Sequence, residues 1–168
     1  MRGTTRGAVL FLSGLIVGAG VMASVAAQGT MNTGLRLNHV GVSVPNFQET
    51  LDFYENVMGY HIAYRFPPPA DGREATAFIQ ISRDTFIELA QARAGANASI
   101  THIGVGADNL ATTVARLRQN GATNATDPRT SANSGSGLAN VTDPAGIRTE
   151  LNEQPPESLM SQAIARWK

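Results

Sequence analysis

Two histidines and two glutamates recur in this 168-residue sequence at nearly constant spacing. His39 lies in the segment NHVGV, and His102 lies 63 residues later in the similar segment THIGV. Glu88 and Glu150, in the segments FIEL and RTEL, are 62 residues apart. Imidazole nitrogen and carboxylate oxygen are ligands for Zn, Ni, Fe, Co or Mn. The spacing therefore predicts a divalent metal site with room for water or substrate on the ion.

The recurrence as pairs is what favours a metal site over ordinary polar residues. A single strand histidine is more often a hydrogen-bonded core or surface residue, and a single strand glutamate is usually solvated. His61, the third histidine, has no counterpart in the repeat. We expect His61 to be structural.

The elements that must position these residues also occur twice. Each copy of about 60 residues begins with a strand and continues with a helix that ends at Gly59 or Gly121, where a left-handed cap is favoured. Two or three strands follow in each copy. The expected strands are 37–44, 60–66, 76–81 and 85–91, then 100–106, a weak strand near Thr123, 137–141 and 147–152, and the expected helices are 49–58 and 111–120. A Gly/Ser-rich segment, 131–137, is expected to be a mobile loop.

Strand alternation predicts where the paired residues point. His39 shares a strand face with Gly41 and Ser43, opposite a face of branched aliphatic residues. His102 likewise shares its face with Gly104. Glycines beside the histidines leave open space, as a ligand cavity requires.

Composition excludes several other classes of protein. The chain has 13 Lys and Arg, 13 Asp and Glu, and no dense basic run, so nucleic acid is not an expected partner. It contains no cysteine, which excludes disulfides, thiolate zinc sites and cysteine nucleophiles. Any metal must be held by histidines and carboxylates. With 42% hydrophobic residues the chain can build a core.

The N-terminal residues 1–27 have the parts of a signal peptide. They contain Arg2 and Arg6 but no acidic residue, then an uncharged apolar stretch and the small residues VAA before Gln28. The sequence thus predicts a secreted or periplasmic protein with no stable membrane association after cleavage. The alternative is an uncleaved membrane anchor, because the 20 residues from Ala8 to Ala27 carry no charge.

A tail at 155–168 is expected to form a C-terminal amphipathic helix. Its apolar residues fall on one helical stripe, which would dock on the domain or on a partner subunit. They are Leu159, Met160, Ala163, Ile164 and Trp167.

These motifs, with the segments FYENVMGY at 53–60 and DPAG at 143–146, resemble the vicinal oxygen chelate superfamily. That superfamily includes glyoxalase I, methylmalonyl-CoA epimerase, extradiol dioxygenases and bleomycin-resistance proteins. The resemblance covers about residues 36–153. It implies an α+β domain at 35–153 made of paired βαβββ modules, about 35–95 and 99–153, which form a curled mixed sheet around a metal cavity. The implied metal ligands are His39, Glu88, His102 and Glu150.

The order His, Glu, His, Glu is that of glyoxalase I-like members, whereas epimerases commonly have Gln at the position of Glu88. The resemblance therefore implies a metal-dependent lyase or isomerase, similar to lactoylglutathione lyase. It would chelate two neighbouring oxygens of a small substrate and move a proton through an enediolate, with Glu150 or Glu88 as the base.

The expected substrate contacts are Arg148 and Ser43. Arg148 shares a strand face with Glu150 and can pair with an anionic substrate. Ser43 stands where glyoxalase I-like enzymes often carry an arginine that helps hold glutathione, so glutathione is not the expected cosubstrate. Two alternatives stay open, an Fe(II) extradiol-type dioxygenase in which Glu88 is not a ligand, and a non-catalytic small-molecule-binding or resistance protein. The resemblance also leaves a homodimer as an option.

Overall fold

The computed structural model describes residues 33–168, and the predicted signal peptide at 1–27 lies outside them. The first module contains β1 (Leu35–Val44), α2 (Phe47–Asp52), the short π-helix η1 (Phe53–Val57), β2 (His61–Arg65), β3 (Ala77–Ser82) and β4 (Thr85–Gln91). The second contains β5 (Ser99–Ala107), α3 (Leu110–Gln119), β6 (Arg129–Thr130), β7 (Gly137–Thr142) and β8 (Arg148–Glu153), and α4 (Leu159–Arg166) follows. No helix within 33–168 is long and apolar enough to cross a membrane.

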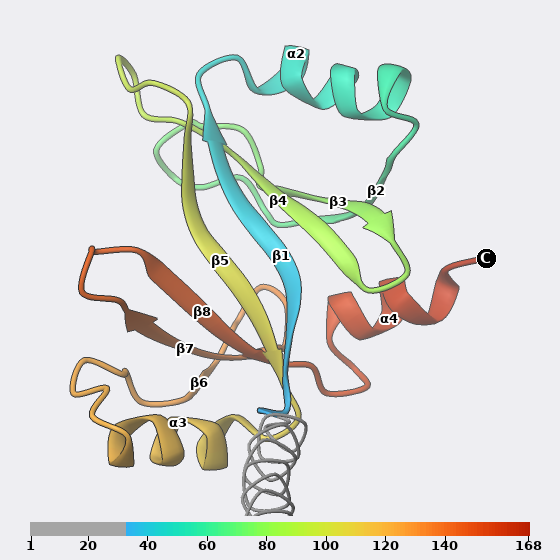
Figure 1. Ribbon diagram of the computed structural model, residues 1–168. Helices are drawn as coiled ribbons and strands as arrows, with labels where there is room; N and C mark the ends of the chain where they lie inside the picture. The colour runs from blue at the N-terminus through green and yellow to red at the C-terminus, as the bar shows by residue number, and fades with distance from the viewer. Residues whose placement is uncertain (1–32) are drawn as a thin grey trace, which may run out of the picture. The chain divides into compact units, whose positions relative to one another are not determined.

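All eight strands form one mixed sheet in the order β2-β3-β4-β1-β5-β8-β7-β6. Within each module the first and last strands are parallel, β1 with β4 and β5 with β8. The two modules join where β1 and β5 pair antiparallel, which is visible in the middle of Figure 1. The strand order is thus the same in both directions from this junction, and the fold is the expected α+β arrangement of two βαβββ modules.

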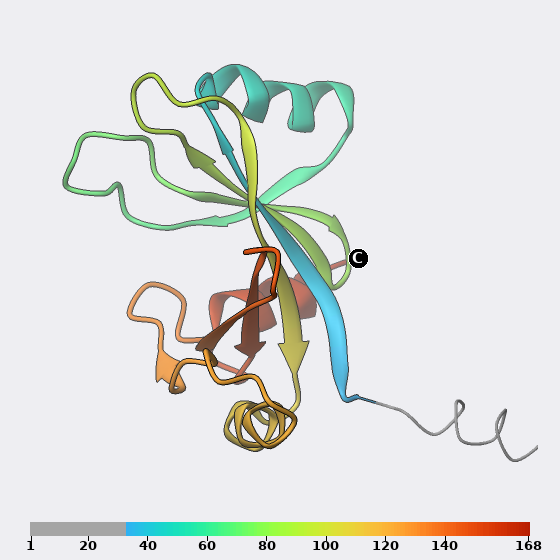
Figure 2. The same ribbon diagram turned by 60° about the vertical axis from the view of Figure 1, so that its left-hand side comes forward.

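Each module has its own apolar core between a helix and the sheet. In the first, Phe47 and Leu51 of α2 pack on Ile79 and Leu89. In the second, Leu110 and Val114 of α3 pack with the strand residue Leu151. Figures 1 and 2 show α2 and α3 at opposite ends of the β1–β5 pair.

The terminal helix α4 follows the second module in sequence but packs on the first. Met160 and Ala163 are buried against Phe78 and Phe86 of the first module. The backbone N–H of Leu159 also donates to the carbonyl of Ser134 in the second module. The apolar stripe of α4 therefore lies on the domain and bridges the two halves.

Most element boundaries differ from the expected ones by one or two residues. Gly59 and Gly121 have φ values of 71° and 98°, so both provide the expected left-handed cap. The prediction of a weak strand near Thr123 is wrong, because that segment forms a turn and the short strand β6 lies at Arg129–Thr130. Thr123 donates its backbone N–H to the Gly121 carbonyl within this turn, so a strand ladder cannot form there.

Candidate metal centre

The predicted ligands lie on the four neighbouring strands at the centre of the sheet. They are Glu88 on β4, His39 on β1, His102 on β5 and Glu150 on β8. One nitrogen or oxygen from each residue lies within 4.8 Å of those from the other three. The structure therefore brings together residues that are far apart in the sequence, and we call them the four-residue cluster.

The strand register explains why each histidine motif contains a glycine. Gly41 on β1 pairs with Glu88 on one side and with His102 on the other. Gly104 has the equivalent place between the remaining histidine and glutamate. A Cβ on either glycine would overlap the histidine ring of the opposite module, whereas glycine leaves that ring room to lie across the strand. The open space predicted beside the histidines is thus filled by the partner module's imidazole.

Donor separations in the cluster suit a single bound ion. The two histidine Nε2 atoms are 2.9 Å apart. Oε2 of Glu88 is 3.5 Å from Nε2 of His39 and 3.2 Å from Nε2 of His102. Oε1 of Glu150 is 3.7 Å from Nε2 of His39. Atoms that bind one ion at about 2.0–2.2 Å in adjacent positions lie roughly 3 Å apart, so the donor set fits a divalent metal.

The surroundings of His39 hold its ring in the form that binds a metal. Its side chain is 1% exposed, and Nδ1 lies 2.6 Å from Oδ1 of Asn38. Nδ1 must donate in this contact, because a carbonyl oxygen only accepts. The lone pair of Nε2 therefore faces the cluster, with Asn38 as the outer partner that orients the ring.

His102 has a different set of outer contacts. Nη2 of Arg148 donates to Nδ1 of His102 at 2.7 Å, and Oγ1 of Thr101 lies 2.9 Å from the same nitrogen. An arginine cannot accept a hydrogen bond, so Nδ1 carries no proton in this arrangement. Binding of an ion at Nε2 would place the proton on Nδ1, where Thr101 is the available acceptor.

Burial and charge separate the pKa values of the cluster. Burial lowers the pKa of His39 to about 4, although the Glu88 carboxylate opposes the shift, so the ring is neutral at pH 7. Burial also raises the pKa of Glu150, and the charge of Glu88 raises it further. At Glu88 burial opposes ionisation, but the hydrogen bond from His102 and the favourable electrostatic interactions with His39, His102 and Arg148 outweigh it and lower the pKa.

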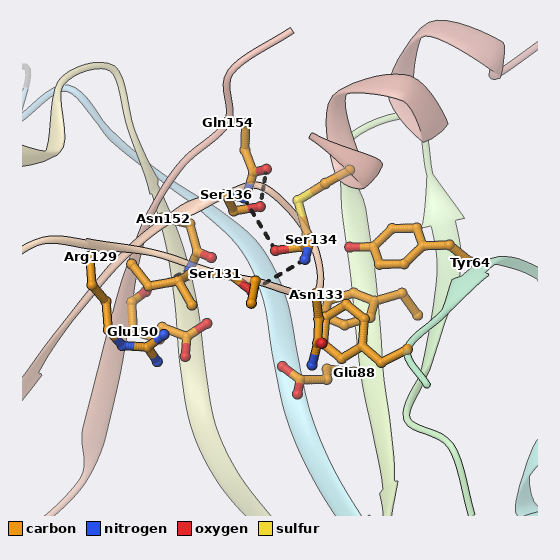
Figure 3. A pocket seen from close by; sticks show the side chains of 15 residues that line it. Tyr64, Glu88, Arg129, Ser131, Asn133, Ser134, Ser136, Glu150, Asn152 and Gln154 are labelled. Atoms are coloured by element: carbon orange, nitrogen blue, oxygen red, sulfur yellow. Dashed lines mark hydrogen bonds between the residues drawn. The ribbon is translucent and has the colours of Figure 1, made fainter. Parts of the chain in front are cut away.

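A cavity of about 340 Å³ opens beside the two glutamates (Figure 3). Tyr64, Phe66 and Phe78 form an aromatic wall, with Tyr64 stacked on Phe78 at a centroid distance of 4.6 Å. Burial, together with the negative charges of the two glutamates, raises the pKa of Tyr64, so its phenol stays protonated at neutral pH. The remaining lining residues are Arg129, Ser131, Ala132, Asn133, Ser134, Ser136, Leu138, Asn152, Gln154 and Met160.

The other residues singled out in the sequence lie around this site. Arg148 contacts the cluster through His102 and through Oε2 of Glu150, 3.5 Å from its Nη1. Ser43 pairs with Ser99 near the end of β1, and the described lining of the cavity does not include it. His61 stacks on the Trp167 ring at 5.4 Å, away from the four-residue cluster.

Sequence reasoning missed most of the cavity wall. Tyr64, Gln154 and the serines of 131–136 have no counterpart in the repeat, so no spacing pattern pointed to them. The Gly/Ser-rich segment was expected to be a mobile loop. Its Ser131, Ser134 and Ser136 are instead buried and hydrogen bonded, as when the backbone N–H of Ser136 donates to Oγ of Ser134.

Comparisons with known proteins agree with this architecture. A methylmalonyl-CoA epimerase in complex with methylmalonyl-CoA and NH4+ has a TM-score of 0.62 and 20% identity over 73% of this chain and 96% of its own. A single-residue variant of Streptomyces coelicolor methylmalonyl-CoA epimerase in complex with 2-nitronate-propionyl-CoA has a TM-score of 0.61 and 19% identity over 73% and 96%. A hypothetical protein from Bacillus halodurans C-125 has a TM-score of 0.59 and 20% identity over 72% and 95%.

At these identities the likeness shows a shared fold. A comparison with curated protein sequences found no match. The sequence model of one family matches residues 36–151, which include both modules and all four residues of the cluster. The chain therefore belongs to the Glyoxalase/Bleomycin resistance protein/Dioxygenase superfamily.

Proposed function

We propose that this protein is a metal-dependent isomerase or lyase of the glyoxalase I-like type. It would bind two neighbouring oxygens of a small substrate and move a proton between adjacent carbons. The observation that carries the proposal is the four-residue cluster, with donor atoms within 4.8 Å of one another beside a cavity. The resident ion would be Zn, Ni, Fe, Co or Mn, since the donors are imidazoles and carboxylates.

His39, His102 and Glu88 are the residues best placed to hold the ion. Glu88 lies within 3.5 Å of both histidine Nε2 atoms, whereas the ion pairs of Glu150 are with His39 at 3.7 Å and with Arg148 at 3.5 Å. When bound, a divalent ion supplies a Lewis acid that polarises the substrate oxygens.

Glu150 is our proposed base. It lies at the edge of the cluster and lines the cavity, so its carboxylate can reach a substrate C–H as well as the ion. Burial raises its pKa and makes it a stronger base than an exposed carboxylate. Arg148, beside Oε2 of Glu150, can orient that carboxylate or pair with an anionic substrate.

The proposed metal binding is tested by measuring the metal content of the purified full-length protein. We expect about one ion per chain in the wild type and in His61→Ala, whose ring lies outside the cluster, and none in His39→Ala. A wild type with no bound metal after incubation with each candidate ion would overturn the proposal.

The proposed proton transfer, with Glu150 as the base, is tested by exchange of a substrate proton with deuterated water. NMR of small 2-hydroxy and 2-oxo acids and thioesters would detect exchange next to the carbonyl. We expect the metal-loaded wild type to catalyse it and Glu150→Gln to lose at least a hundredfold in rate while retaining the metal, because general base catalysis contributes roughly 10²–10⁴-fold. If Glu150→Gln exchanges as fast as the wild type, Glu150 is not the base.

The aromatic wall favours one alternative, an Fe(II) extradiol-type dioxygenase. Glu88 is not a ligand in this alternative, so His39, His102 and Glu150 would hold the iron, and a set of two histidines and one carboxylate is typical of Fe(II) oxygenases. Oxygen uptake by the Fe(II)-loaded protein with catechols would favour this alternative over proton transfer.

We also propose that the protein is exported, so that the reaction takes place outside the cytoplasm. This rests on the basic and apolar pattern of residues 1–27. The mass of the protein recovered from the periplasm or the medium is expected to correspond to a chain beginning near Gln28.

A further inference from the structure

One side-chain amide in the wall of the cavity is only half paired. Oε1 of Gln154 accepts hydrogen bonds from Oγ of Ser136 at 2.8 Å and from Oγ of Ser158 at 3.0 Å. Nε2 of Gln154 is buried and has no hydrogen-bond partner among the described residues, the only such side-chain atom there. A buried N–H group without a partner costs about 1–3 kcal/mol, so an acceptor from a ligand would relieve it.

The neighbouring serines determine which end of the amide is unpaired. Ser158 caps α4, and its Oγ accepts from the backbone N–H of Ser161 at 3.2 Å. Its hydroxyl hydrogen is therefore available for Oε1 of Gln154. Turning the amide around would leave that hydrogen without this acceptor, so Nε2 is the free end and the group that it needs is a hydrogen-bond acceptor.

Figure 3 shows Glu88 and Glu150 toward one end of the cavity and Gln154 toward the other. Tyr64 lies along the side between them, in the same aromatic wall as Phe66 and Phe78. Aromatic faces favour flat, unsaturated ligands, which stack on them. At about 340 Å³ the cavity is at the small end of the roughly 300–1,000 Å³ range of ligand pockets, so its size suits a small molecule.

Charge around the cavity favours an anion. Arg129 is the cationic side chain among the described lining residues. A divalent ion would balance the two glutamates, which leaves the charge of Arg129 uncompensated. The cavity of the loaded protein would thus carry a net positive charge.

We propose that the cavity binds a small, flat, unsaturated anion in one orientation. Two neighbouring oxygens lie at the four-residue cluster, the planar body stacks on the aromatic wall, and a carboxylate at the far end accepts a hydrogen bond from Nε2 of Gln154. The metal end of this pose rests on the proposed function. The subsite at Gln154 is independent of which reaction follows.

Two catechols distinguish the subsite from the metal site. 3,4-Dihydroxybenzoate has two neighbouring oxygens, a flat ring and a far carboxylate, and catechol lacks only the carboxylate. Calorimetry on the Zn²⁺-loaded full-length protein, without oxygen, would give the ratio of their affinities.

Gln154→Glu keeps the oxygen that accepts from both serines but replaces the N–H donor with an acidic oxygen. Gln162→Glu adds the same charge on the exposed side of α4.

We expect the wild type and Gln162→Glu to bind 3,4-dihydroxybenzoate at least tenfold more tightly than catechol. In Gln154→Glu this preference disappears while catechol still binds, which also reports that the variant is folded. Arg129→Gln, at an exposed position of β6, is expected to reduce the preference in part.

Four results would contradict the inference. Catechol binding without any preference for 3,4-dihydroxybenzoate overturns the subsite and leaves the metal site standing. A preference that survives in Gln154→Glu shows that Gln154 does not recognise the carboxylate and overturns the subsite too. Failure of both ligands to bind to the Zn²⁺-loaded protein overturns this inference, while the proposed function keeps its own tests of metal content and proton exchange. Equal binding by the wild type and His39→Ala shows that the four-residue cluster does not hold the two oxygens and overturns the proposed pose.

Discussion

At the scale of single residues, the two glycines of the histidine motifs are the most constrained positions. A Cβ at Gly104 would overlap the His39 ring, and the ring cannot move away because it is 1% exposed. We expect Gly104→Ala to weaken metal binding at least tenfold and to lower the free energy of unfolding by about 1–3 kcal/mol. Gly106→Ala is the control, since its Cβ would meet no atom closer than 3.6 Å. Metal titration and urea unfolding of both variants check this, and an unaffected Gly104→Ala would refute it.

The lowered pKa of His39 predicts loss of stability in acid. The folded protein holds this pKa at about 4, against 6.5 for an ordinary histidine, so between these values the unfolded chain binds a proton that the folded chain does not. The free energy of unfolding of metal-free protein should fall from pH 6.5 to pH 4 by about 1.4 kcal/mol per unit, roughly 3 kcal/mol in all. Urea unfolding in a chelator at several pH values measures this slope.

The variant His39→Gln removes the titrating group, so its stability should depend less on pH over this range. His61→Gln should keep the slope of the wild type, because His61 stacks on Trp167 away from the cluster. Equal slopes in all three proteins would assign the acid sensitivity to other groups.

The four-residue cluster was predictable from the sequence because duplication marks each member twice. Once His39 and His102 are aligned, Glu88 and Glu150 align as well, and strand alternation gives them a common face. Gln154 has no counterpart in the repeat, so duplication does not point to it. Its role depends on where α4 places Ser158 and on how the loop places Ser136, and both are tertiary contacts that no spacing in the sequence encodes.

At the scale of elements, α4 links the two halves of the cavity wall. Met160 is 2% exposed, packs on Phe78 of β3, lines the cavity and accepts a long hydrogen bond of 3.6 Å from Asn38, the outer partner of His39. We expect Met160→Ala to lower the free energy of unfolding by about 2–4 kcal/mol, as buried methionine truncations do, and to weaken binding of aromatic ligands. Chemical denaturation and calorimetry measure the two effects.

An exposed position on the same helix provides the control for Met160→Ala. Gln162→Ala should change the free energy of unfolding by less than about 0.5 kcal/mol. If the two variants are equally stable, α4 is an appendage and does not support the cavity. The sequence predicted the helix and its apolar stripe, but it left open whether that stripe covers the domain or a partner, because a stripe does not identify its own docking surface.

At the scale of the whole molecule, the site exists only where the two modules meet. Each module supplies one histidine and one glutamate, and the antiparallel pairing of β1 with β5 brings these pairs face to face. Neither half alone has enough donors for the proposed ion. Binding of the ion should therefore stabilise the joined modules as one unit.

This coupling predicts how metal changes unfolding of the full chain. An ion that binds only the folded protein adds about 2.7 kcal/mol to the free energy of unfolding at one hundred times its Kd. We expect Zn²⁺ or Mn²⁺ to shift a single denaturation transition by about this amount in the wild type and in His61→Ala. His102→Ala should show no shift, since only one module then keeps its full donor pair. Two separate transitions, with metal acting on one of them, would mean that the modules fold independently and that one half holds the ion alone.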